Sequence, residues 1–151
     1  MTVRKFRPPN RLASMIKDRG GILAKDALAA AEANIETLRE SSLAALDAAL
    51  EAIEARFGPG APDRASEDFE TLYTMTLKVV DVSGFAADAG VDEAAVSLCA
   101  LVDACAEAGA WRWDAVDVHL SALRLLRNVG ASLPAEHRRG MLEGLHKVVQ
   151  R

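Results

Sequence analysis

The sequence has few aromatic residues and only two cysteines. Aromatic side chains account for 5% of the 151 residues, and Cys99 and Cys105 lie outside any CxxC motif or Cys/His cluster. This spacing argues against a zinc site, and two cysteines are too few for the disulfide framework of a small secreted protein. We therefore expect two buried free thiols in a reducing compartment, the cytoplasm.

Long apolar runs are also missing. No stretch reaches the ~18 to 20 apolar residues needed to span a bilayer. Arg4, Lys5 and Arg7 are followed by Pro8 and Pro9 rather than by the apolar core of a secretion signal. We therefore expect neither secretion nor membrane insertion. Half of the residues are apolar and 26% are charged, a balance typical of one folded domain with a real core.

Proline is absent from residues 10–58 and 63–133, and strand-forming residues are scarce. This composition predicts an all-α protein. Apolar spacing and the positions of glycine and proline indicate five main helices, near residues 22–57, 67–88, 92–107, 111–128 and from 134 onward. One or two further helical turns are expected at residues 11–17. The short breaks between the later helices predict an antiparallel up-and-down bundle.

Charge is unevenly distributed along the chain. Residues 1–25 contain seven basic residues and one acidic residue, whereas the other 126 contain 11 basic and 21 acidic residues. A segment with a net charge of +6 is therefore followed by one with a net charge of −10. We divide the chain into a basic N-terminal arm, residues 1–21, and a single helical-bundle domain, residues 22–151. The acidic domain disfavours nucleic acid, because it would repel phosphates. The arm either contacts an anionic partner or is a polar leader that aids solubility.

Motifs that carry catalytic chemistry are missing. The sequence has no phosphate-binding GxxxxGK[ST] or GxGxxG loop, no GxSxG motif and no HExxH motif. Glu143 and His146 have the ExxH spacing of di-iron bundles, but those need two such pairs and two more carboxylates. Neither His119 nor His137 belongs to a recognisable catalytic arrangement. The sequence therefore predicts a protein that is not an enzyme and uses no metal or cofactor.

The most specific pattern lies in residues 76–101, which read TLKVVDVSGFAADAGVDEAAVSLCAL. Gly84, Ala86 and Gly90 follow Val80 at four, six and ten positions. This pattern resembles the histidine-phosphotransfer (HPt) domain of bacterial two-component signalling. There, a phosphorylatable histidine is followed by an apolar residue at two positions, a basic residue at three, glycine at four and ten, and a small residue at six. Here Val80 stands at the histidine position and Ser83 at the basic position.

The resemblance implies an HPt-like four-helix core with a long N-terminal helix and an extra C-terminal helix. It also implies a signalling module that docks a response-regulator receiver domain or a histidine kinase in a two-component or chemotaxis pathway. Phosphotransfer is not implied, because Val80 has no nucleophilic nitrogen and Ser83 no charge to neutralise a phosphoryl group. The docking surface that the resemblance implies consists of Thr76, Val80, Ser83, Gly84 and Ala87.

A second interpretation needs no signalling partner. The first predicted helix, at roughly 36 residues, would be ~54 Å long, which exceeds the needs of a four-helix unit. A homodimer through this helix, with contacts beginning at Leu28, is compatible with either function, and the alternative function is an oligomeric interaction scaffold. Gly84 then serves close packing between helices instead of docking. Trp111, Arg112 and Trp113 form either an interface hot spot or a cap on the bundle core.

Overall fold

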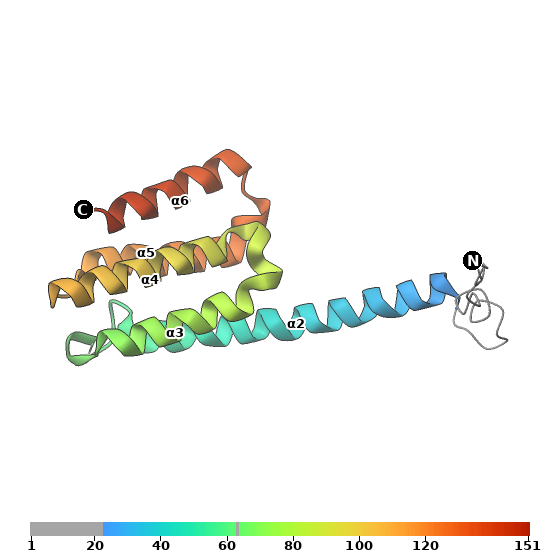
Figure 1. Cartoon of the computed structure of the whole chain (residues 1–151), viewed down its shortest axis with the longest axis horizontal. Helices are drawn as coiled ribbons and strands as arrows, with labels where there is room; N and C mark the ends of the chain where they lie inside the picture. The colour runs from blue at the N-terminus through green and yellow to red at the C-terminus, as the bar shows by residue number, and fades with distance from the viewer. Residues whose placement is uncertain (1–22, 63) are drawn as a thin grey trace, which may run out of the picture. The chain divides into compact units, whose positions relative to one another are not determined.

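The computed structural model describes residues 23–62 and 64–151. These residues form α-helices joined by short 3-10 segments, without a strand among them, which confirms the predicted all-α class (Figure 1). The elements are α2 (Ala24–Phe57), η1 (Arg64–Ser66), α3 (Phe69–Val82), η2 (Ser83–Ala89), α4 (Val91–Ala108), α5 (Trp113–Val129), η3 (Gly130–Ser132) and α6 (Ala135–Val149). The basic arm and the helical turns predicted at residues 11–17 lie outside the described residues. None of the described helices is long and apolar enough to cross a membrane.

The chain divides into two units between Thr37 and Leu38, inside α2. In the first unit, the described residues 23–37 belong to α2 from Ala24 onward, and all of them are exposed. The second unit, residues 38–151, contains the rest of α2 and every later helix. It also contains the hydrophobic core.

The core of the second unit is built around α4. Helix α4 contacts α3, α5 and α6, and Figure 1 shows these helices side by side. Burial of apolar side chains at three- and four-residue spacing is the main stabilising contribution in such a bundle. The fully buried large side chains include Leu46, Ile53 and Phe57 of α2, Leu72 and Val79 of α3, Leu98, Leu101 and Val102 of α4, and Leu123 and Leu126 of α5.

Polar contacts attach α5 to its neighbours. Two arginines of α5 form ion pairs with acids of α2, at N–O distances of 2.5 and 2.8 Å, namely Arg124–Glu54 and Arg127–Asp47. Arg112, just before α5, donates hydrogen bonds to the carbonyls of Val148 and Val149. The start of α5 therefore lies beside the end of α6.

Caps and glycines place most helix ends within about two residues of their predicted positions. The carboxylate of Asp68 accepts a hydrogen bond from the N–H of Thr71 at 2.6 Å and caps the start of α3. Gly90 and Gly109, with φ of 80° and 63°, flank α4 in the left-handed conformation that favours glycine.

The helix predicted at residues 67–88 is wrong at its C-terminal end, because α3 stops at Val82. Both the backbone N–H and the hydroxyl of Ser83 donate to the carbonyl of Val80. These bonds span three residues and begin the 3-10 segment η2 instead of another α-helical turn. Gly84 consequently lies in η2 and not inside an α-helix.

The contact between η2 and η3 requires a glycine. A Cβ atom at Gly130 would lie 2.6 Å from the carbonyl oxygen of Ala89 and 2.9 Å from its Cβ. Any larger residue would therefore push the two segments apart. Arg138 donates to the carbonyl of Gly130 at 3.0 Å and so attaches α6 to the same place.

An aromatic cluster lies where the α2–α3 connection meets the start of α5. Trp111 stacks on Trp113 with 4.5 Å between ring centroids, and its ring lies 4.4 Å from that of Phe69. Its indole N–H donates to the carbonyl of Glu67 at 3.1 Å, while the guanidinium of Arg64 lies 4.7 Å from the Trp113 ring. Both tryptophans pack against the core, which confirms that at least one of them caps it.

Candidate functional site

The docking residues predicted from the sequence lie at the end of α3 and in η2, and two of them are buried. Thr76 is fully buried and donates its hydroxyl to the carbonyl of Leu72 at 2.8 Å. Ser83 is 1% exposed and donates its hydroxyl to the carbonyl of Val80 at 2.8 Å. The side chains of Thr76 and Ser83 therefore contribute no exposed surface to a docking site.

The remaining predicted residues leave a small exposed surface. Gly84 is exposed, and a Cβ atom built on it would meet no atom within 4 Å, so the interpretation of Gly84 as a site of close helix packing is wrong. Val80 is half-buried against the core, and the side chain of Ala87 lies outside what the structure describes. Nearby, Leu77 and Phe85 are 41% and 37% exposed. We call Leu77, Val80, Gly84 and Phe85 the α3-end surface.

A serine and a histidine meet inside the bundle. The Ser97 hydroxyl lies 3.0 Å from Nε2 of His119, and Nδ1 of His119 lies 2.8 Å from the carbonyl oxygen of Ala115. Because a carbonyl only accepts, Nδ1 carries the proton and Nε2 accepts from Ser97. Ser97 and His119 are 3% and 0% exposed, so no substrate reaches the hydroxyl. The pair is a structural link between α4 and α5.

The two cysteines are free and buried, as predicted. Burial, together with the nearby charge of Asp103, raises the pKa of the Cys99 thiol to about 11. The thiolate that attacks substrates and binds metals is therefore scarce at neutral pH. Within the described residues, no group of three or more His, Cys, Asp or Glu side chains is placed to hold a metal ion.

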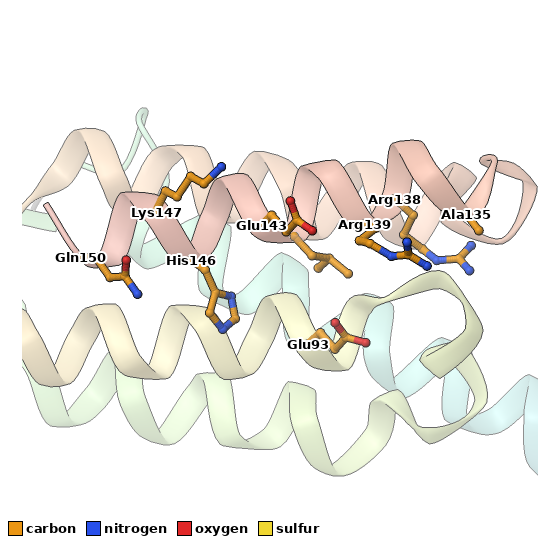
Figure 2. Close-up of a pocket in the computed structure, with 9 residues that line it drawn as sticks. Glu93, Ala135, Arg138, Arg139, Glu143, His146, Lys147 and Gln150 are labelled. Atoms are coloured by element: carbon orange, nitrogen blue, oxygen red, sulfur yellow. The ribbon is translucent and has the colours of Figure 1, made fainter.

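A groove of about 570 Å³ runs between α4 and α6. Figure 2 shows His146 extending from α6 toward α4, with Glu93 on the α4 side. The charged side chains that line the groove are Glu93, Arg138, Arg139, Glu143 and Lys147. Cations and carboxylates are thus mixed, and Arg138 already binds the carbonyl of Gly130. This mixture does not select a ligand of one charge.

The N-terminal half of α2 presents an exposed apolar face. Leu28, Ile35 and Leu38 are 63%, 54% and 57% exposed, and Ala31 lies between them at the same helical spacing. Their spacing of three, four and three residues places the four side chains on one side of the helix. We call Leu28, Ala31, Ile35 and Leu38 the α2 stripe.

Every residue from 24 to 41 is exposed, so this part of α2 gains no stability from burial. In proteins, most of the stability of a helix comes from packing of its apolar face rather than from intrinsic helix propensity. The α2 stripe is therefore the strongest candidate for a contact with another protein.

Comparison of the chain with protein-family models, curated proteins and solved structures gives no match. The only support for the resemblance of residues 76–101 to an HPt domain is therefore the pattern of residues in this sequence.

Two features of the site region had no signal in the sequence. Ser97 and His119 lie 22 residues apart on different helices. The α4–α6 groove likewise combines Glu93 with residues 135–150. The α2 stripe, in contrast, was visible as apolar spacing in the predicted first helix.

Proposed function

We propose that the chain is a non-catalytic interaction scaffold that forms a homodimer through the α2 stripe. The observation that carries this proposal is the exposure of Leu28, Ile35 and Leu38, each more than half exposed on one side of a helix. Removing such side chains from water favours association, and a second copy presents the same apolar face. Dimerisation would also supply the packing that residues 24–41 of α2 lack.

The spacing of the α2 stripe fits a helix–helix contact. Leu28 and Ile35 are seven residues apart, as are Ala31 and Leu38, which matches the a and d positions of a coiled coil. The stripe consists of three large apolar side chains and the small Ala31, which lies between Leu28 and Ile35. A pair of copies related by a two-fold axis would bury apolar side chains of the stripe from both copies.

We predict that the protein sediments as a dimer and that Ile35→Glu converts it to a monomer. A carboxylate at the centre of the apolar contact would lose its water without gaining a partner, which costs several kcal/mol. Val118→Glu is the matched control, because Val118 is 48% exposed on α5, outside the stripe. Sedimentation velocity of the three proteins at high micromolar concentration measures the result. A monomeric parent protein would contradict the proposal.

A second candidate function is docking of a receiver domain or a histidine kinase without phosphotransfer in a two-component or chemotaxis pathway. The observation that favours it is the open space at Gly84, where a partner can approach the backbone, beside the exposed side chains of Leu77 and Phe85. Transfer of phosphate is not part of the proposal, because Val80 has no nucleophilic nitrogen and the ring of His119 is buried.

Gly84→Arg tests this second function. We expect the variant to lose binding to a purified receiver or kinase domain while its circular dichroism is unchanged, because a Cβ atom at this position meets no atom within 4 Å in the free protein. Gly140→Arg on α6 is the control, since a Cβ atom there also meets nothing within 4 Å. Equal binding by both variants, or acid-labile phosphate on the parent chain after incubation with an active kinase, would contradict this function.

A further inference from the structure

Charged residues beside the α2 stripe alternate in sign along one edge. We place Leu28 and Ile35 at position a of a coiled-coil heptad and Ala31 and Leu38 at position d. Residues at position e then lie along one edge of the stripe, and residues at position g lie along the other. The e residues are Lys25, Glu32 and Arg39, and the g residues are Ala27, Asn34 and Ser41. All six belong to the continuous helix α2, and all are exposed. Opposite charges therefore occur on the e edge alone.

We propose that two copies of the chain pair through α2 in antiparallel orientation, with Glu32 of each copy facing Arg39 of the other. This inference rests on the proposed dimer and adds its direction and register. Ile35 packs against the partner's Leu38, and Leu38 packs against the partner's Ile35. On the opposite edge, Asn34 lies beside the partner's Ser41.

The charge pattern decides between parallel and antiparallel orientation. In a parallel pair, the e edge of one helix faces the g edge of the other, so charged residues would meet only Ala27, Asn34 and Ser41. In an antiparallel pair, the e edge of one helix faces the e edge of the other, and the two g edges face each other. The antiparallel pair therefore forms two Glu32–Arg39 contacts, and the parallel pair forms none.

The same charges select the register within the antiparallel pair. A shift by one heptad would pair Leu28 with the partner's Leu38, which also buries large apolar side chains. It would, however, bring Glu32 against the partner's Glu32 and Lys25 against the partner's Arg39. Like charges at such positions oppose pairing, and specificity in coiled coils commonly arises from this kind of repulsion. The register that joins Ile35 to the partner's Leu38 avoids both repulsions.

Charge exchange between positions 32 and 39 tests the register. Glu32→Arg places an introduced arginine opposite Arg39 twice, and Arg39→Glu places an introduced glutamate opposite Glu32 twice. Each single variant is expected to raise the dimer dissociation constant about tenfold or more, because two attractive contacts become repulsive. The double variant Glu32→Arg/Arg39→Glu restores both contacts and should return the constant to within about threefold of the parent value.

An equimolar mixture of the two single variants gives a sharper result. In the mixture, one chain carries arginine at both positions and the other carries glutamate at both, so every contact between unlike chains joins opposite charges. A heterodimer therefore forms even where each variant alone is a monomer. Glu36→Arg is the control, because position 36 lies outside both edges and should leave the constant unchanged. Sedimentation equilibrium in buffer of low ionic strength measures all of these samples, since salt screens exposed pairs.

The outcomes separate this inference from the proposed dimer. If Ile35→Glu abolishes the dimer but the single charge variants behave like Glu36→Arg, the dimer stands and the antiparallel register is overturned. Failure of the mixed variants to form a heterodimer also overturns the register. A parent protein that is monomeric at every concentration overturns both proposals.

Discussion

At the scale of single residues, His119 is a base held neutral in the core. Burial is the largest cause of its lowered pKa, and the positive charge of Arg112 acts in the same direction, while the hydrogen bond to Ala115 opposes them. Protonation would place a charge among apolar side chains and turn Nε2 from an acceptor of the Ser97 hydroxyl into a donor. Burial therefore favours the neutral ring, in which Nε2 accepts from the Ser97 hydroxyl.

We predict that the free energy of unfolding decreases as the pH falls below about 6.5. In the unfolded chain His119 titrates near its ordinary pKa of about 6.5, whereas its pKa in the folded protein is lower. Between these two pKa values the unfolded state binds more protons, so stability falls with falling pH by at most about 1.4 kcal/mol per unit. Urea unfolding at about pH 7.5, 6.5 and 5.5 covers this window.

Two histidine variants identify the group responsible. His119→Gln is expected to be less stable at neutral pH and to lose this pH dependence. His137→Gln alters an exposed side chain that is not among the causes of the lowered His119 pKa, and it should retain the pH dependence. An unchanged pH dependence in His119→Gln would show that another group causes the effect. Asp68 does not contribute to the change in stability in this pH window, because the hydrogen bonds with Thr71 lower its pKa from 3.8.

Hydroxyl side chains explain why part of the docking surface could not be predicted. Thr76 and Ser83 are polar residues that a sequence pattern places on a surface, yet each donates its hydroxyl to a carbonyl three or four residues earlier. This local bond satisfies the hydroxyl and allows burial. Thr76 and Ser83 each lie four residues after a buried residue, Leu72 or Val79, and this spacing indicates a buried position. Their polar side chains instead suggest a position on the surface.

At the scale of elements, the contact between η2 and η3 is sensitive to one methyl group. We predict that Gly130→Ala lowers the free energy of unfolding by about 1–3 kcal/mol, because overpacking forces a backbone shift. The added Cβ would lie 2.6 Å from the carbonyl oxygen of Ala89, which cannot rotate away as a flexible side chain can. Equilibrium unfolding in urea measures the change.

Gly144→Ala is the matched control on α6. A Cβ atom there meets nothing within 4 Å, and alanine favours a helix over glycine. The free energy of unfolding should therefore rise by roughly 0.5–1 kcal/mol. Equal effects of the two substitutions would mean that the η2–η3 contact is not the cause of the expected loss.

Most helices could be predicted because glycine, proline and apolar spacing are local signals. They place both ends of α4 and α5 within about two residues. The end of α3 was not predictable in this way, because it is set by the Ser83 bonds to Val80, and the far end of the η2 segment that follows is fixed by the Gly130–Ala89 contact. The latter joins segments about 40 residues apart, so no local pattern records it.

At the scale of the whole molecule, the proposed dimer couples association to helix formation. Residues 24–41 of α2 are exposed in a single chain, so packing of the apolar face does not stabilise this part of the helix there. Dissociation should therefore release helical structure as well as separate the copies. The free energy of helix formation in residues 24–41 is then linked to the free energy of dimer association.

We predict that helical ellipticity per residue falls on dilution across the dimer dissociation constant. The melting temperature should also rise with protein concentration, because association stabilises the folded form by mass action. Circular dichroism in cells of different path length measures both. Ellipticity independent of concentration would show that α2 is helical without a partner.

Removal of residues 1–21 tests whether the basic arm takes part. We expect the truncated protein to remain a dimer by light scattering, because the proposed contacts begin at Leu28. The deletion takes away six basic residues and one acidic residue, leaving the remaining chain more acidic. Dissociation after truncation would assign the arm a role in assembly.

The aromatic cluster has a consequence for how unfolding can be observed. Trp111 and Trp113 are the two tryptophans of the chain, and Trp111 contacts Phe57 and Phe69 at the α2–α3 connection. Intrinsic fluorescence will thus report the opening of that connection, whereas far-ultraviolet dichroism sums over every helix, including residues 24–41. When the copies separate, the dichroism signal will change while the emission spectrum stays the same, so the two spectra distinguish dissociation from unfolding without any added label.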